Sequence, residues 1–89
     1  MKVKTRTDLA TEWVEQCLII LDKRNDRIHE LNATASTVWS ELVKTGDTEL
    51  AVRLIVDIFD TLPETASHDV DEIVELFRQQ NLLVDVQPN

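Results

Sequence analysis

The side chains that could do chemistry in this chain of 89 residues are one cysteine, two histidines and seventeen carboxylates. Cys17 beside His29 or His68 would supply a nucleophile with its general base, and the same side chains are metal ligands. The two histidines lie on different predicted elements, however, and the sequence has no Cys-x-x-Cys, His-Glu-x-x-His or EF-hand pattern. We therefore expect no metal site and no cofactor.

Cys17 opens the longest apolar run of the sequence, CLIIL at residues 17–21. A cysteine among aliphatic side chains is expected in the core, where burial leaves the thiol inert. The carboxylates fall at predicted helix starts and on solvated faces, and a domain this small rarely builds the pocket that acid–base catalysis needs. A single glycine cannot form a phosphate-cradling loop. We therefore predict that the chain is not an enzyme.

Net charge and hydropathy limit the classes of partner that we expect for this chain. The sequence has nine Lys and Arg against seventeen Asp and Glu, a formal net charge of -8, which disfavours a polyphosphate and so predicts no nucleic acid partner. The apolar run at 17–21 is too short to cross a bilayer, and the basic N-terminus is not followed by an apolar stretch, so we predict no membrane partner. One cysteine cannot form an internal disulfide, which favours a reducing cytoplasm.

The first third of the chain predicts a small antiparallel sheet. Residues 9–14 are a weak strand candidate, residues 17–21 are rich in the branched side chains of a buried strand, and residues 27–31 form a returning strand. Lys23-Arg24-Asn25-Asp26 between the last two has the composition of a hairpin turn. Residues 1–8 are expected to be flexible.

Helical patterns fill the remainder. The first helix begins after Asn32, whose side chain can cap it, carries an apolar stripe that includes Val43, and ends near Gly46. Residues 47–48 offer a cap for the second helix, which ends before residues 62–63 because Pro cannot continue a helix. Its apolar stripe is so wide that we expect this helix to be central.

The third helix is expected to start at Ser67, with Asp69 and Asp71 in its first turn, where the helix dipole favours negative charge. It ends around residues 80–81, and residues 82–84 return to cover the sheet or to form a short strand. The result is one α+β domain over residues 1–89. Its expected architecture is a winged helix-turn-helix: a small antiparallel three-stranded sheet followed by three helices.

Two surface features concern contacts. Leu76 lies off the core stripe of the third helix, in line with Asp69, so it either covers a loop or contacts a partner. In the strand at residues 27–31, alternate side chains point to opposite faces, and the pattern does not say which face is inward. As the last strand of a short sheet it is expected at an edge, which is either an aggregation hazard blunted by charge or a docking site for an extended peptide.

Several motifs in this order resemble the PqqD-like proteins. They are LIILD at residues 18–22, RIHELNATA at residues 27–35 and VW at residues 38–39. Weaker matches are TE at 48–49, DV at 69–70 and NLL at 81–83, and the resemblance covers roughly residues 9–86. Residues 44–47 replace the family's common Asp-Gly turn and Asn81 replaces a Gly, which affects loop geometry more than fold.

The resemblance implies a recognition element for the leader of a ribosomally made precursor peptide, which adds as a strand to the sheet edge. The residues that would supply the main-chain ladder are Arg27, Ile28, His29, Glu30 and Leu31. Those that would form the facing wall of the groove are Asp69, Ile73 and Leu76. The implied enzyme partner is a radical SAM enzyme or a lasso-type protease or cyclase.

Two other functions remain open at this stage. A winged-helix DNA-binding regulator would have to place the second helix in a major groove with Arg53 as its only base, amid Glu49, Asp57 and Asp60. A scaffolding or dimerising domain is the other alternative, because an open sheet edge also permits a homodimer.

Overall fold

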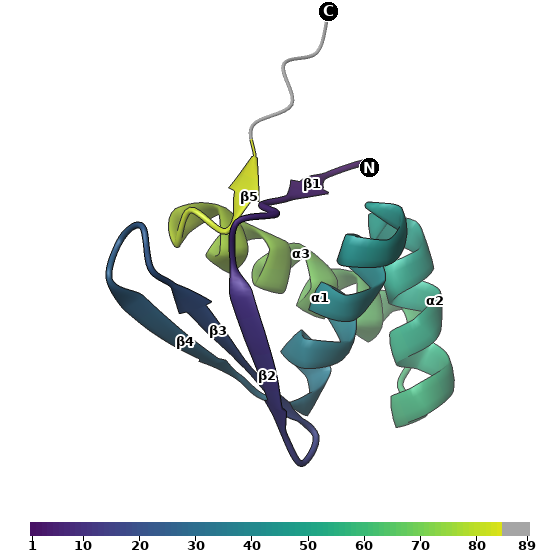
Figure 1. The fold of residues 1–89 in the computed structure, drawn as a ribbon. Coiled ribbons are helices and arrows are strands. Elements are labelled where there is room, and N and C mark those ends of the chain that lie inside the picture. Colours follow the sequence, from purple (N-terminus) through teal and green to yellow (C-terminus); the bar gives the residue numbers. More distant parts are fainter. Residues whose placement is uncertain (85–89) are drawn as a thin grey trace, which may run out of the picture.

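The computed structural model describes residues 1–84, in which a three-stranded sheet precedes three helices, as predicted (Figure 1). The strands of this sheet lie in the order β2 (Ala10–Val14), β3 (Cys17–Asp22) and β4 (Arg27–Leu31), all antiparallel. The helices are α1 (Ala33–Thr45), α2 (Thr48–Phe59) and α3 (Pro63–Gln79). A second antiparallel pair joins β1 (Lys4–Thr5) to β5 (Leu83–Val84), so part of the segment for which we expected no element forms a strand.

Alternation along β3 decides which side chains reach the core. Leu18 and Ile20 are buried and face the helices, whereas Cys17 at the start of the strand is exposed. The prediction that Cys17 packs in the core is therefore wrong. A continuous apolar run suggests that every side chain is buried, but the two-residue period of a strand with one covered face sends only alternate residues inward.

The two ends of α1 are as predicted. The Asn32 side-chain oxygen accepts a hydrogen bond from the Ala35 amide at 2.8 Å, and Gly46 has φ 68° and donates its amide to the Leu42 carbonyl at 2.8 Å. A Cβ at position 46 would lie 2.5 Å from the Val3 carbonyl oxygen, so only glycine permits both the cap and the passing N-terminal chain. Val43 is exposed, contrary to its place in the predicted stripe.

The prediction that α2 is central is wrong. Only Ala51, Ile55 and the N-terminal Thr48 are buried, while Ile58 is 56% exposed. This helix packs on α1 and α3 and lies at the outside of the domain, away from the sheet (Figure 1). Its stripe is wider than the face that its two neighbours cover, so several apolar side chains remain in solvent.

The predicted start of α3 is also wrong. The helix begins at Pro63 with Leu62 as its N-cap, not at Ser67. Proline fits the first turn because its missing N–H would have no helical partner there. Asp69 and Asp71 consequently lie inside the helix, not in its first turn.

The core forms where α1 and α3 meet the inner face of the sheet. Trp39 of α1 and Phe77 of α3 contact each other edge to face, with ring centroids 5.2 Å apart and planes at 85°. Ile20 of β3 and Leu82 after α3 are fully buried in the same cluster. This geometry is the favoured one for aromatic pairs and fixes α3 against α1.

Ser36 ties α1 to two strands. Its side chain is fully buried, and its hydroxyl accepts a hydrogen bond from the Leu18 amide at 2.8 Å while donating to the Leu31 carbonyl at 3.1 Å. Leu18 and Leu31 are register partners on β3 and β4. The hydroxyl therefore satisfies one main-chain group on each strand and sets the position of the helix against both.

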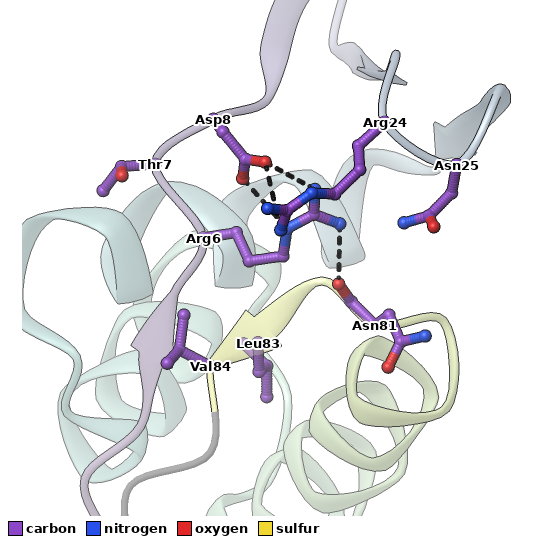
Figure 2. A pocket seen from close by; sticks show the side chains of 8 residues that line it. All are labelled: Arg6, Thr7, Asp8, Arg24, Asn25, Asn81, Leu83 and Val84. Atoms are coloured by element: carbon purple, nitrogen blue, oxygen red, sulfur yellow. Dashed lines mark hydrogen bonds and ion pairs between the residues drawn. The ribbon is translucent and has the colours of Figure 1, made fainter.

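A buried ion pair between Arg6 and Asp22 anchors the N-terminal segment, and Figure 2 shows the other contacts of Arg6, with Asp8 and the Asn81 carbonyl. The Arg6 guanidinium donates to Asp22 at 2.8 and 3.1 Å, to Asp8 at 2.8 and 2.9 Å, and to the Asn81 carbonyl at 3.0 Å. The Asp22 side chain has no exposed surface, and the Asn25 side chain also donates to it at 2.8 Å. These hydrogen bonds, from Arg6 first and then Asn25, hold the pKa of Asp22 well below its usual range.

We expect Ser36→Ala to lower the free energy of unfolding by about 1–3 kcal/mol, because the Leu18 amide and the Leu31 carbonyl lose their partner in the core. Urea unfolding followed by tryptophan fluorescence measures this change. Ser67→Ala, at an exposed position of α3, is the matched control and should stay within about 0.5 kcal/mol of the parent. Equal effects of the two substitutions would contradict the bridging role.

Protonation of Asp22 should account for part of the loss of folding stability at low pH. Because its folded-state pKa is lowered, its contribution to stability is present above the unfolded-state value of 3.8 and is lost as pH falls through the folded-state value. Urea unfolding at pH values from about 6 down to about 2 should show this loss in the parent protein. Asp22→Asn should be less stable at neutral pH and should lack that part of the acid dependence.

The control for this experiment is Asp71→Asn, at an exposed position of α3. It should leave both the stability at neutral pH and the acid dependence close to those of the parent. A parent-like acid profile in Asp22→Asn would show that the Arg6 pair does not stabilise the fold.

Candidate functional site

One edge of β4 has no partner strand among residues 1–84, because the sheet order places β3 on its other side. His29 and Leu31 are buried at 8% and 5% exposure, whereas Ile28 is 69% exposed and Glu30 is exposed. This settles which face of the strand is inward: the one that carries Arg27, His29 and Leu31. A free edge of this kind offers unpaired N–H and C=O groups to an extended chain.

The end of α3 lies beside the start of β4. Arg27 lines a hollow of about 210 Å³ together with Gln79 and Gln80 at the C-terminus of α3. On the helix, Gln80 continues a row formed by Asp69, Ile73 and Leu76 at spacings of four, three and four residues. That row therefore faces the same side of α3 as the hollow beside Arg27.

The row on α3 is partly uncovered. Leu76 is 46% exposed, Ile73 is partly buried against the core, and Asp69 is partly buried. The structure thus places the two groups of residues from the sequence prediction on neighbouring elements, the strand residues at a free edge and the helix residues on the flank of α3.

Two buried polar atoms lack a hydrogen-bond partner in the described part of the chain, and they belong to these same two elements. They are Nε2 of His29 on β4 and Oε1 of Gln80 at the end of α3. Unpaired buried polar atoms are uncommon in folded proteins. Strand alternation puts His29 on the inward face of β4, and Gln80 lines the hollow that Arg27 shares with the end of α3.

A larger hollow of about 530 Å³ adjoins the first and shares Asn25 and Asn81 with it (Figure 2). The Arg6 side chain lies at its base, paired with Asp8, and the 76% exposed Arg24 reaches to 3.9 Å from the same Asp8. The hydrogen bond from Arg6 also lowers the pKa of Asp8. The hairpin end of the sheet is thus surrounded by polar and basic groups.

Sequence reasoning missed Arg6. The residue stands in a segment without an apolar pattern, and its buried partner Asp22 is 16 positions away. The one available signal was Asp22 itself, a carboxylate at the end of a buried strand. Such a group requires a cation or several hydrogen bonds.

Residues 1–84 contain no cluster of three or more His, Cys, Asp or Glu side chains that could hold a metal ion. Within the same residues, none of the helices is both long and apolar enough to span a membrane.

Two solved structures share this fold. "TbiB1 in Complex with the TbiA(beta) Leader Peptide" superposes with a TM-score of 0.85 at 18% sequence identity, over 96% of this chain and 99% of that one. "Lasso peptide synthetase B1 complexed with the leader peptide" gives 0.83 at 14% identity, over 96% and 100%. A comparison with curated protein sequences finds no match.

Family membership follows from the sequence itself. The family model described as coenzyme PQQ synthesis protein D (PqqD) matches residues 17–83, from the first residue of β3 to the first residue of β5. The match takes in the β3–β4 hairpin, all three helices and the turn into β5, which is well over half of the chain. This protein belongs to the PqqD family.

Proposed function

We propose that this protein binds the leader region of a ribosomally synthesised precursor peptide and presents it to a modifying or processing enzyme, without catalysing a reaction itself. The observation that carries the proposal is the free edge of β4, which meets the end of α3 at the hollow beside Arg27, while Leu76 is partly exposed on the same flank of that helix. Membership of the PqqD family and the likeness to two chains solved with leader peptides support it.

In the proposed complex the leader adds to the sheet as a further strand alongside β4. The residues that offer main-chain hydrogen bonds are Arg27, Ile28, His29, Glu30 and Leu31. The side chains that face the leader from α3 are Asp69, Ile73 and Leu76. Main-chain pairing accepts many sequences, so the apolar contacts with Leu76 and Ile73 would select the register.

This mode of binding suits a protein that presents the leader to an enzyme and then releases it. A disordered leader loses conformational entropy when it becomes a strand, so the affinity is moderate and the peptide can be released. While bound, the precursor is held at a high local concentration beside its enzyme. The enzyme classes that fit are a radical SAM enzyme and a lasso-type protease or cyclase, acting in the cytoplasm where the precursor is made.

The test is a titration of the isotopically labelled protein with a synthetic leader peptide from the precursor gene that neighbours the gene for this chain. Amide shifts should concentrate on β4 and on α3 between Asp69 and Leu76. Leu76→Glu should raise the dissociation constant about tenfold or more, because roughly 1–2 kcal/mol of apolar contact is lost and a carboxylate is desolvated. Leu76 is nearly half exposed, so the substitution should leave the fold intact.

Ile58→Glu on α2 is the matched control, since Ile58 is an apolar side chain with similar exposure on a different face. It should bind the leader as the parent does. Equal weakening by both substitutions, or amide shifts confined to β2 and α2, would reject the groove. Shifts caused by a DNA duplex and not by the leader would instead favour a DNA-binding regulator, and a concentration-dependent mass without leader binding would favour a dimerising domain.

A further inference from the structure

The basic residues of this acidic protein are concentrated in the first third of the sequence. Six of the nine Lys and Arg lie within residues 1–27. Arg6 is neutralised by Asp8 and Asp22. Within residues 1–84, by contrast, no carboxylate forms an ion pair with Arg27. The start of β4 therefore carries an uncompensated positive charge at the sheet edge.

Arg27 is also placed on the side of β4 that faces α3. It has the same parity as the buried His29 and Leu31, and it lines the hollow of about 210 Å³ at the end of α3. The other residues that line this hollow are all uncharged amides: Asn25, Gln79, Gln80 and Asn81. The hollow beside Arg27 is thus polar and basic, whereas Leu76, one turn earlier on the same flank of α3, is an exposed apolar side chain.

We propose that this hollow binds an acidic side chain of the leader peptide, and that Arg27 with its neighbouring amides thereby fixes the register of the bound strand. The inference rests on the proposed function above. Residues opposite each other on antiparallel strands have Cβ atoms about 4.5–5.5 Å apart, so a carboxylate opposite Arg27 lies within reach of its guanidinium. The amide groups of Gln79 and Asn25 add hydrogen-bond donors around it.

The same geometry predicts the spacing between two leader residues, the one that contacts Leu76 and the one that enters the hollow. Leu76 precedes Gln80 by four helical residues, a rise of about 6 Å, and His29 follows Arg27 by two strand residues, a rise of about 6.6 Å. A peptide side chain opposite His29 therefore meets Leu76 when the one opposite Arg27 meets Gln80. Because a strand antiparallel to β4 runs from Leu31 toward Arg27, the expected leader pattern is an apolar residue followed two positions later by Asp or Glu.

The C-terminus of α3 opposes this binding through the negative end of its dipole. Three of its last carbonyls are already occupied, however, because those of Leu76, Phe77 and Arg78 accept main-chain amides. The carbonyl of Asn81, just past the end of the helix, accepts the Arg6 guanidinium at 3.0 Å. A cation is thus already bound next to the helix end. Because Arg6 and not Arg27 binds at the end of the helix, the positive charge of Arg27 remains available to pair with a carboxylate of the peptide.

The experiment uses the synthetic leader described above, labelled with fluorescein, and versions in which each Asp or Glu is replaced in turn by Lys. Arg27→Glu should raise the dissociation constant of the parent leader about tenfold at low ionic strength, and less at high salt, because the partly exposed pair is screened. One of the lysine-containing peptides should bind Arg27→Glu better than it binds the parent protein. Arg53→Glu on α2 has the same change in net charge and should show neither effect.

The outcomes separate the two proposals. A leader that does not bind the parent protein would overturn the proposed function and the inference with it. A leader that binds the parent protein, together with equal effects of Arg27→Glu and Arg53→Glu or no rescue by any lysine-containing peptide, would overturn the acidic subsite alone. Thermal unfolding of Arg27→Glu, together with the milder Arg27→Gln, checks that any loss of binding is not a loss of fold.

Discussion

The buried ion pair between Arg6 and Asp22 is the constraint on which the arrangement of the domain depends. A carboxylate without exposed surface is destabilising unless it is paired and hydrogen-bonded, and Arg6 and Asn25 provide both. Because Arg6 also binds the Asn81 carbonyl, a single guanidinium joins the N-terminal segment, the β3–β4 hairpin and the end of α3. It acts together with the Trp39–Phe77 contact and the Ser36 hydrogen bonds, which position α3 and the sheet through α1.

Local signals account for what was predicted correctly. The strand at Arg27–Leu31 and both ends of α1 follow from turn composition and from the capping preferences of Asn32 and Gly46, which act within a few residues. The errors concern burial. The exposure of Cys17 and the outer position of α2 depend on which faces other elements cover, and no local pattern contains that information.

The same contrast between local signals and contacts with distant elements applies to the candidate site. Its residues on β4 and α3 were chosen from the family resemblance and from the off-stripe position of Leu76. The inward face of β4 was undecidable, because both of its faces carry polar and apolar residues in alternation. The role of Arg6 could not be predicted from the sequence for a different reason. It arises from a contact between positions far apart in the chain, and from a short strand pair that has little apolar content.

The pairing of β1 with β5 has a consequence for where such a domain can be used. Lys4 lies opposite Val84, so the first and last strands of the described chain pair with each other (Figure 1). Adjacent ends are what allow a domain to be inserted into a loop of a host protein without stretching either. A domain of this fold can therefore be carried as an internal segment of a larger polypeptide as readily as a terminal one, while the edge of β4 that is free among residues 1–84 stays accessible.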